Sequence, residues 1–215
     1  MPAELTPDQT LEAARALLDE ALRSGGRRLL GIAGAPGAGK SSLTTWLSEQ
    51  LPVDSCAVVP MDGFHLADVS LQRLGRLDRK GAPDTFDAAG YVTLLQRLRT
   101  SRSTDPAVWA PLFERDLEQP LAGGIEVPGQ VPLVLTEGNY LLLDEGPFAH
   151  VRSMLDACWF VEAPEELRHQ WLIARHERFG KDPEAARAWA LGPDEANARL
   201  VAATRARADA VVGLK

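Results

Sequence analysis

Cysteine is scarce in this chain of 215 residues, which contains only Cys56 and Cys158. Neither cysteine has a second one at C-x-x-C spacing, and each lies inside an apolar run. We therefore expect both thiols to be reduced core residues in a reducing compartment. A disulfide between them is not expected.

Long apolar runs and an excess of basic residues are also missing. No segment approaches the roughly 18 apolar residues of a membrane helix, and Met1–Glu4 has no basic region followed by an apolar stretch. The net charge of −7 and the pI near 5.2 argue against a nucleic-acid-binding surface, because phosphate backbones are bound by accumulated Lys and Arg. These absences predict a soluble, cytoplasmic protein that binds neither nucleic acid nor a membrane.

The length predicts one domain over residues 1–215, since about 100–200 residues per domain is usual. An N-terminal helix within 1–26 is indicated by Thr6 as a cap, Pro7 at the first helical position and Gln9 completing a capping box. We expect this helix to brace a sheet without taking part in chemistry.

The clearest motif is Gly34-Ala35-Pro36-Gly37-Ala38-Gly39-Lys40-Ser41, which fits the phosphate-binding pattern Gly-x4-Gly-Lys-Ser. It lies between an apolar run at 28–33, typical of a buried parallel strand, and a helical pattern at 41–50. Backbone N–H groups of such a loop surround phosphates, Lys40 reaches the β- and γ-phosphates, and the Ser41 hydroxyl suits Mg²⁺. The predicted nucleotide-binding residues are Gly34, Ala35, Pro36, Gly37, Ala38, Gly39, Lys40, Ser41 and Ser42.

Two acids follow further predicted strands. Asp62 ends the apolar run 56–61 and Glu137 ends the run 132–136. Because ligands bind at the carboxyl ends of the strands in an open α/β sheet, Asp62 is a candidate base and Glu137 a candidate metal-side acid. Asp62-Gly63 also fits a simple turn, and Asp144 after Leu141–Leu143 is a rival for the metal-side position that we disfavour.

The segment 68–87 is rich in charge and poor in periodicity, which is typical of a binding loop or a solvated surface loop. The segment contains three candidate substrate residues, Arg79, Lys80 and Asp84. A fourth candidate, His65, lies in the flank just before the segment. Residues 101–131 also lack convincing periodicity apart from short extended pieces, and we predict an irregular insertion there. Arg115 within it is a candidate anion-binding residue.

The region 164–190 contains two helical stretches separated by a Gly and Pro break, which predicts a lid over a triphosphate. Arg175 is its candidate catalytic residue, because a guanidinium stabilises charge on a transferring phosphoryl group. Arg168 reads as an ordinary surface charge. With strands at 157–161 and 210–212 and a last helix at 194–207, the sequence predicts an α/β fold with a five-stranded, mainly parallel sheet, helices on both faces and a lid.

These pieces together resemble a known superfamily of kinases. The phosphate loop and the segments 60–66, 79–87, 137–140 and 175–176 are similar to those of the uridine kinase, phosphoribulokinase and bacterial pantothenate kinase superfamily. The resemblance is strongest to its small bacterial branch, labelled nucleoside/nucleotide kinase or fructose-transport-system kinase. It covers the chain from about Leu29 to Val212. It implies the three-layer P-loop NTPase fold.

The resemblance also implies roles for several residues. Asp62 would accept the proton of the substrate hydroxyl, Asp84 would help to hold substrate hydroxyls, and Glu137 would assist Mg²⁺. Arg175, and less surely Arg168, match the lid arginines. Where nucleoside kinases of this group carry Tyr-Asp-Phe, this chain has Phe113-Glu114-Arg115, a departure from the uridine-binding pattern.

The sequence thus predicts an ATP- and Mg²⁺-dependent phosphotransferase acting on a hydroxyl of a small metabolite: a sugar or sugar acid, a pantothenate-like compound or a nucleoside. The alternatives are a nucleotide-dependent switch or assembly factor and a nucleotide sensor. Residues 78–81 match Asp-x-x-Gly of a switch, but no buried strand precedes them and no Asn-Lys-x-Asp motif occurs in the chain. A homodimer is compatible with the sequence.

Overall fold

Strand β2, which leads into the phosphate loop, lies inside a parallel sheet with the order β1-β8-β7-β2-β6-β3. The computed structural model describes residues 2–213. In that range the main sheet has six strands, one more than the sequence predicted, because the short N-terminal strand pairs with β8. The strands are β1 (Ala3–Leu5), β2 (Arg28–Gly34), β3 (Cys56–Val58), β6 (Leu133–Gly138), β7 (Ala157–Glu162) and β8 (Ala210–Gly213).

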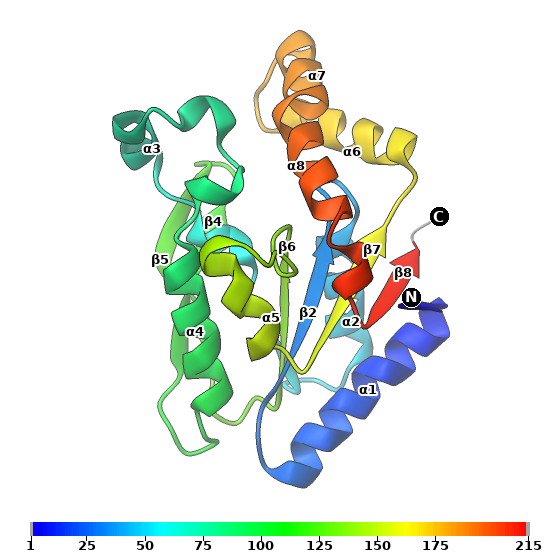
Figure 1. Ribbon diagram of the computed structural model, residues 1–215. Helices are drawn as coiled ribbons and strands as arrows, with labels where there is room; N and C mark the ends of the chain where they lie inside the picture. Colours follow the sequence, from blue (N-terminus) through cyan, green and yellow to red (C-terminus); the bar gives the residue numbers. More distant parts are fainter. Residues whose placement is uncertain (1, 214–215) are drawn as a thin grey trace.

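Helices cover both faces of this sheet, as the sequence predicted (Figure 1). The α-helices are α1 (Pro7–Ser24), α2 (Lys40–Gln50), α3 (Asp68–Leu74), α4 (Ala88–Thr100), α5 (Val151–Met154), α6 (Glu165–Arg178), α7 (Pro183–Leu191) and α8 (Pro193–Ala202). The capping box between Thr6 and Gln9 is present at the start of α1. The last predicted helix, 194–207, is shorter than expected, since α8 ends at Ala202 and only a 3₁₀ turn follows over Arg205–Arg207.

Alternate residues of β2 divide the core into two apolar clusters. Leu30 and Ile32 pack with α1 and α2 on one face of the sheet. Leu29 and Ala33 pack on the other face, where α4, α5 and α8 contribute apolar side chains. Side chains alternate across a strand, so the continuous buried run from Leu29 to Gly34 fits a strand that is covered on both faces.

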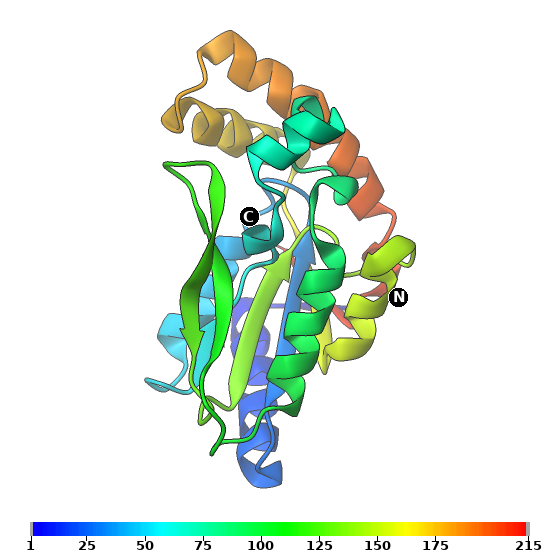
Figure 2. The same cartoon turned by 90° about the vertical axis from the view of Figure 1, so that its left-hand side faces the viewer.

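The structure of the segment 101–131 differs from the prediction. It contains an antiparallel hairpin of β4 (Val108–Glu114) and β5 (Gln119–Val127) rather than an irregular insertion. Pro111, Pro120 and the Gly123-Gly124 pair interrupt the strand pattern in the sequence, because proline and glycine are disfavoured inside strands. The hairpin turn lies at the same end of the molecule as α6 and α7 (Figure 2).

The carboxyl ends of the parallel strands point toward α6 and α7 (Figure 1). The segment 68–87 also lies at this end and is more ordered than a plain loop, since it contains α3 and two 3₁₀ turns, Leu77–Arg79 and Pro83–Thr85. The phosphate loop, the hairpin turn and the segment 68–87 therefore all lie at the carboxyl-terminal end of the sheet.

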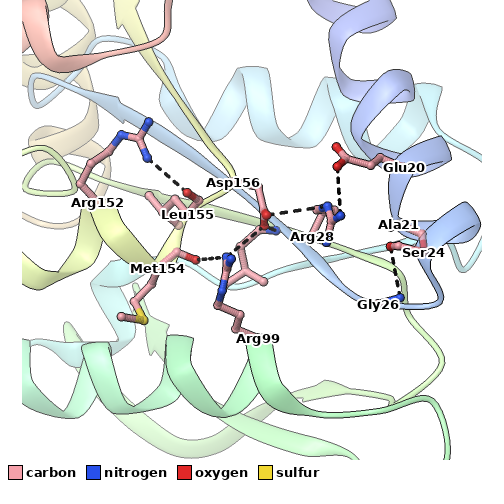
Figure 3. Close-up of polar contacts among 11 residues, drawn as sticks. Glu20, Ala21, Ser24, Gly26, Arg28, Arg99, Arg152, Met154, Leu155 and Asp156 are labelled. Carbon is pink, nitrogen blue, oxygen red and sulfur yellow. Dashed lines mark hydrogen bonds and ion pairs between the residues drawn. The ribbon is translucent and has the colours of Figure 1, made fainter.

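The opposite, amino-terminal end of the sheet is tied together by polar contacts (Figure 3). Arg28 at the start of β2 forms an ion pair with Glu20 of α1 at 3.0 Å and with Asp156 before β7 at 3.7 Å. Arg99 of α4 donates to the Met154 carbonyl at 3.0 Å. These contacts are structural and remote from the candidate site. Between residues 2 and 213, no helix combines the length and the apolar character that crossing a membrane requires.

Candidate active site

The phosphate loop connects the end of β2 at Gly34 to the start of α2 at Lys40, as the motif predicted. Gly37 and Gly39 adopt left-handed backbone angles, with φ of 76° and 88°. At Gly37 a Cβ would come within 2.6 Å of Leu172 in α6, so the close approach of that helix requires a glycine there. The loop thus presents its backbone N–H groups at the start of a helix, which is an anion-binding arrangement.

Lys40 is buried and its ammonium group is held by neutral oxygens. Its Nζ donates to Asn139 Oδ1 at 2.7 Å and to the Ala35 carbonyl at 3.1 Å. Burial lowers the pKa of Lys40, and the nearby carboxylates of Glu137 and Asp62 oppose this shift. Asn139 was not among the predicted site residues, although it lies directly after the end of β6 and within the segment 137–140 that carries the family resemblance.

Ser41 and Glu137 meet next to the loop. Ser41 Oγ donates to Glu137 Oε1 at 2.8 Å. The register of β2 and β6 pairs Ile32 with Glu137, which places the end of β6 beside the phosphate loop. Burial and the charge of Asp62 raise the pKa of Glu137, while Lys40 and the Ser41 hydrogen bond lower it. The rival acid Asp144 lies outside any strand and pairs with Arg207 on the surface.

Asp62 occupies a 3₁₀ turn, Met61–Phe64, that follows the short strand β3. Its Oδ2 accepts a hydrogen bond from Arg115 Nη2 at 2.5 Å. The hairpin can come this close because residue 63 is glycine: a Cβ there would lie 2.2 Å from the Pro111 carbonyl oxygen. Burial by itself would raise the pKa of Asp62, but the nearby basic groups of Arg115, His65, Lys40 and Arg175 lower it to about 2.

His65 lies beside Asp62 and lines the same cavity. Its Nδ1 is 2.8 Å from the Asp62 carbonyl oxygen, so this nitrogen carries the proton and donates. The ring packs between Phe86 and Phe113, with centroid distances of 4.0 and 4.7 Å. Burial lowers the pKa of His65, the Asp62 carboxylate opposes this, and the imidazole has a fixed orientation at the cavity wall.

Among the candidate substrate residues of the segment 68–87, Lys80 is the one that lines the cavity. Its Nζ donates to Asp68 Oδ1 at 2.6 Å and to the Glu118 carbonyl at 2.5 Å, which ties the segment to the hairpin turn. Arg79 and Asp84, the other two candidates from this segment, bond to each other. Neither of them lines the cavity, both side chains are partly exposed, and Asp84 also forms an ion pair with Arg76.

Arg175 of α6 lines the cavity and has no ion-pair partner in the described part of the chain. Arg168, about two helical turns before Arg175, was expected to be an ordinary surface charge, and this prediction was wrong. Arg168 is buried, its Nη1 donates to the Pro36 carbonyl of the phosphate loop at 3.4 Å, and it forms an ion pair with Glu195 of α8. The buried arginine therefore joins α6 to both the loop and α8.

A single cavity of about 360 Å³ connects these groups. Lys40, Ser41 and Glu137 line one part of it, and the hairpin residues Phe113, Arg115 and Glu118 line another. Asp62 lines the cavity together with both of these groups of residues. Residues of α6 and α7 form part of the cavity wall. The cavity residues are Pro36, Lys40, Ser41, Asp62, His65, Asp68, Leu77, Lys80, Gly81, Phe113, Arg115, Glu118, Glu137, Asn139, Arg175, His176, Phe179, Lys181, Trp189 and Asp194.

The oxygen ligands next to the phosphate loop suit a hard divalent cation whose other ligands are mainly phosphate oxygens. Ser41 Oγ and Glu137 Oε1 are adjacent oxygens at the point where the loop meets β6. Residues 2–213 contain no cluster of three His, Cys, Asp or Glu side chains suited to a protein-only metal site. Mg²⁺ needs only one or two protein oxygens when nucleotide phosphates and waters complete its shell.

Comparisons with known proteins give several relatives, some of which are named as kinases. No model of a known protein family matches the chain. The chain is 33% identical over 190 residues to "Uncharacterized protein YggC" of Escherichia coli, covering 86% of this chain and 77% of that protein. It is 31% identical over 168 residues to "Putative uridine kinase C227.14" of Schizosaccharomyces pombe, covering 73% of this chain and 69% of that protein.

Pantothenate kinases match more locally. The chain is 29% identical over 157 residues to the pantothenate kinase of Lacticaseibacillus casei, covering 71% of this chain and 49% of that enzyme. The chain thus spans about half the length of this relative.

A solved structure matches nearly the whole chain. The crystal structure of a "putative fructose transport system kinase" from Silicibacter sp. TM1040 is 37% identical, with a TM-score of 0.82, and the match covers 95% of this chain and 98% of that one. The fold of that structure agrees with the strand, phosphate loop and helix around Lys40. The sequence similarity to uridine kinase and pantothenate kinase agrees with them as well. The chain therefore belongs to the uridine kinase-like and pantothenate kinase-like superfamily of P-loop kinases.

Proposed function

We propose that this protein is a small-molecule kinase that transfers the γ-phosphoryl group of ATP to a hydroxyl of a small metabolite. The observation that carries the proposal is the shared cavity, in which Lys40 and Ser41 of the phosphate loop face the same space as Asp62. A phosphate loop alone indicates nucleotide binding. A carboxylate within the same enclosure adds a group that can receive a proton from an acceptor hydroxyl.

The nucleotide half of the site rests on the loop and on the end of β6. The backbone of 34–40 and the Lys40 ammonium would hold the phosphates, with Lys40 exchanging its Asn139 and Ala35 contacts for phosphate oxygens. Ser41 and Glu137 would hold Mg²⁺. The ion would supply positive charge that offsets the charge developing on the phosphates during transfer.

The acceptor half rests on Asp62. A hydroxyl placed between Asp62 and the γ-phosphate would give its proton to the carboxylate as the oxygen attacks phosphorus. The low pKa of Asp62 ensures that the carboxylate is ionised at neutral pH. Lys40 and Arg175 both face this space, and their positive charges would stabilise the phosphoryl group during transfer.

Helices α6 and α7 would act as a lid over the reacting groups. Arg175 lines the cavity from α6, Lys181 from the link between the helices and Trp189 from α7. Gly180 in this link has a φ of 95°, a conformation that favours glycine. Closure would bring the Arg175 guanidinium to the phosphates and exclude water, which favours transfer to a hydroxyl over hydrolysis.

The test is release of ADP from Mg-ATP in the presence of sugars, sugar acids, nucleosides and pantothenate. A kinase is stimulated strongly by one class of acceptor and forms its phosphorylated product. ADP release that is insensitive to every acceptor, or that rises only with a partner protein, would contradict the proposal and favour a nucleotide-dependent switch.

A further inference from the structure

Arg115 reaches the cavity from the turn of the β4–β5 hairpin and lies directly against Asp62. Its Nη2 donates to Asp62 Oδ2, and no other hydrogen bond of this guanidinium is formed within residues 2–213. The side chain is 37% exposed and lines the cavity. The guanidinium therefore keeps N–H donors available to a molecule that lies next to Asp62.

A second cation shares the wall with Arg115. The Arg115 Cζ lies 5.0 Å and the Lys80 Nζ 5.5 Å from the centroid of the Phe113 ring. Lys80 is fixed by Asp68 and by the Glu118 carbonyl, and only 13% of its side chain is exposed. The two cations are thus held beside one aromatic ring. Because they are already positioned, their side chains would lose little conformational freedom on binding a ligand.

The acids of this wall are mostly occupied. Asp62 pairs with Arg115 and Asp68 pairs with Lys80. Asp84, which the sequence indicated as a ligand for substrate hydroxyls, does not line the cavity. Glu118 lines it and has no ion pair in the described range, so it can accept one hydroxyl. An anion next to Asp62 would meet the free N–H groups of Arg115 and the nearby Lys80 ammonium, charged donors that a neutral compound would leave without an ionic partner.

Building on the kinase function proposed above, we infer that the phosphate acceptor is a small hydroxyl compound that carries a carboxylate or a phosphate. Arg115 binds this anionic group while the reacting hydroxyl faces Asp62. A planar guanidinium binds either anion through two parallel hydrogen bonds, and the Lys80 ammonium adds attraction from the same wall.

The transfer itself balances in one step. The acceptor oxygen forms a bond to the γ-phosphorus as the bond from that phosphorus to the β,γ-bridging oxygen breaks. The hydroxyl proton passes to Asp62, and ADP leaves with the electron pair of the broken bond. The anionic group of the acceptor is unchanged, because Arg115 only positions it.

The experiment compares kcat/KM for matched pairs of acceptors that differ in the anionic group, with Mg-ATP and the full chain. The pairs are D-glycerate and glycerol, D-gluconate and D-glucitol, pantothenate and panthenol, and ribose 5-phosphate and ribose. The charged member of the preferred pair should be favoured at least about 100-fold, because the neutral member leaves Arg115 without its anion. The first three pairs report a carboxylate and the fourth a phosphate.

Arg115→Gln tests the assigned residue, and Arg97→Gln, which removes an exposed arginine from α4, is the matched control. The ratio of charged to neutral kcat/KM should fall by about tenfold or more in Arg115→Gln and stay unchanged in Arg97→Gln. General damage to the site would lower both rates and leave this ratio unaltered.

Each outcome separates the inference from the function on which it rests. Preference for a neutral acceptor, or an unchanged ratio in Arg115→Gln, overturns the inference and leaves the kinase function intact. If ATP binds but none of the pairs, sugars or nucleosides is phosphorylated, the kinase function is overturned and the inference falls with it.

Discussion

At the scale of single residues, Asp62 is the group whose removal has the most specific expected result. Asp62→Asn keeps the size of the side chain but cannot accept the hydroxyl proton. We expect acceptor-dependent turnover to fall by about 10²–10⁴-fold, the usual contribution of a general base, while ATP affinity is retained. Turnover by product formation and affinity by equilibrium binding of ATP measure the two effects.

Asp78→Asn is the matched control for Asp62→Asn. Asp78 is exposed and does not line the cavity, but it is the acid of the Asp-x-x-Gly pattern that a nucleotide switch would use. A kinase should tolerate this change without loss of turnover. A large loss in Asp78→Asn together with full activity in Asp62→Asn would reverse the assignment.

Cys158 in β7 gives a prediction about stability and pH. Burial raises the pKa of its thiol to about 12, whereas a cysteine in the unfolded chain has a pKa of about 8.5. Between these values the unfolded chain loses a proton that the folded chain keeps, so the free energy of unfolding falls as the pH rises. The expected slope from this thiol is about 1.4 kcal/mol per pH unit above about pH 9.

Urea unfolding at pH 8, 9 and 10 measures this slope. In Cys158→Ala the contribution is absent, so the variant should lose less stability than the natural protein between pH 9 and 10. Cys56 is partly exposed, and its pKa is also raised by burial, so Cys56→Ala serves as the comparison. Equal slopes in the natural protein and Cys158→Ala would show that Cys158 does not ionise on unfolding in this range.

Local patterns predicted some of the site residues and failed for others for physical reasons. Lys40, Ser41 and Glu137 could be placed because a loop motif and strand ends are local and the sheet brings them to one edge. Asp84 was expected to hold substrate hydroxyls, but in the structure its side chain pairs with Arg79 and does not line the cavity, a local contact that the sequence did not indicate. Arg168 was missed because its burial depends on Glu195, far along the chain.

At the scale of elements, the end of β6 links the two halves of the site. Asn139 bonds to Lys40 on the nucleotide side. The next residue, Tyr140, is fully buried and its hydroxyl donates at 2.5 Å to the carbonyl of Gly81, which lines the acceptor side. Tyr140 is therefore a positioning residue for the segment that carries Lys80.

Tyr140→Phe should raise the KM for the acceptor by about tenfold without changing ATP affinity, because the Gly81 carbonyl loses its donor at a cost of about 1–3 kcal/mol. Tyr91→Phe is the matched control. Tyr91 is equally buried, but its hydroxyl bonds to Thr136 in the core. Both variants lose stability, measured by urea unfolding, and only Tyr140→Phe should shift the acceptor KM. Equal KM shifts in the two variants would contradict a positioning role.

Sequence patterns revealed the β4–β5 hairpin only in part, as short extended pieces at 108–109 and 125–127 that pair with each other in the structure. Proline in both strands and paired glycines in β5 hide its alternation, and its strands pair with each other rather than with the main sheet. The hairpin nevertheless supplies Arg115 and Phe113 to the cavity. The periodic elements α1, α2, α4, β2 and β6 were predictable because an apolar core dictates their spacing.

At the scale of the whole molecule, the parallel sheet has one chemical end and one structural end. The amino-terminal end is fixed by ion pairs such as Arg28 with Asp156. The carboxyl-terminal end gathers a phosphate loop, an acid and a cationic wall around one cavity. The central claim is that this cavity is a two-substrate site, in which the phosphoryl group passes to a bound hydroxyl compound and not to water.

Transfer of label from γ-³²P-ATP tests this claim most directly, with the preferred acceptor present and the products separated. The account predicts labelled, phosphorylated acceptor in equal amount to the ADP formed, and almost no labelled acceptor with Asp62→Asn. Label that appears only as inorganic phosphate, in the same amount with and without acceptor, would contradict it.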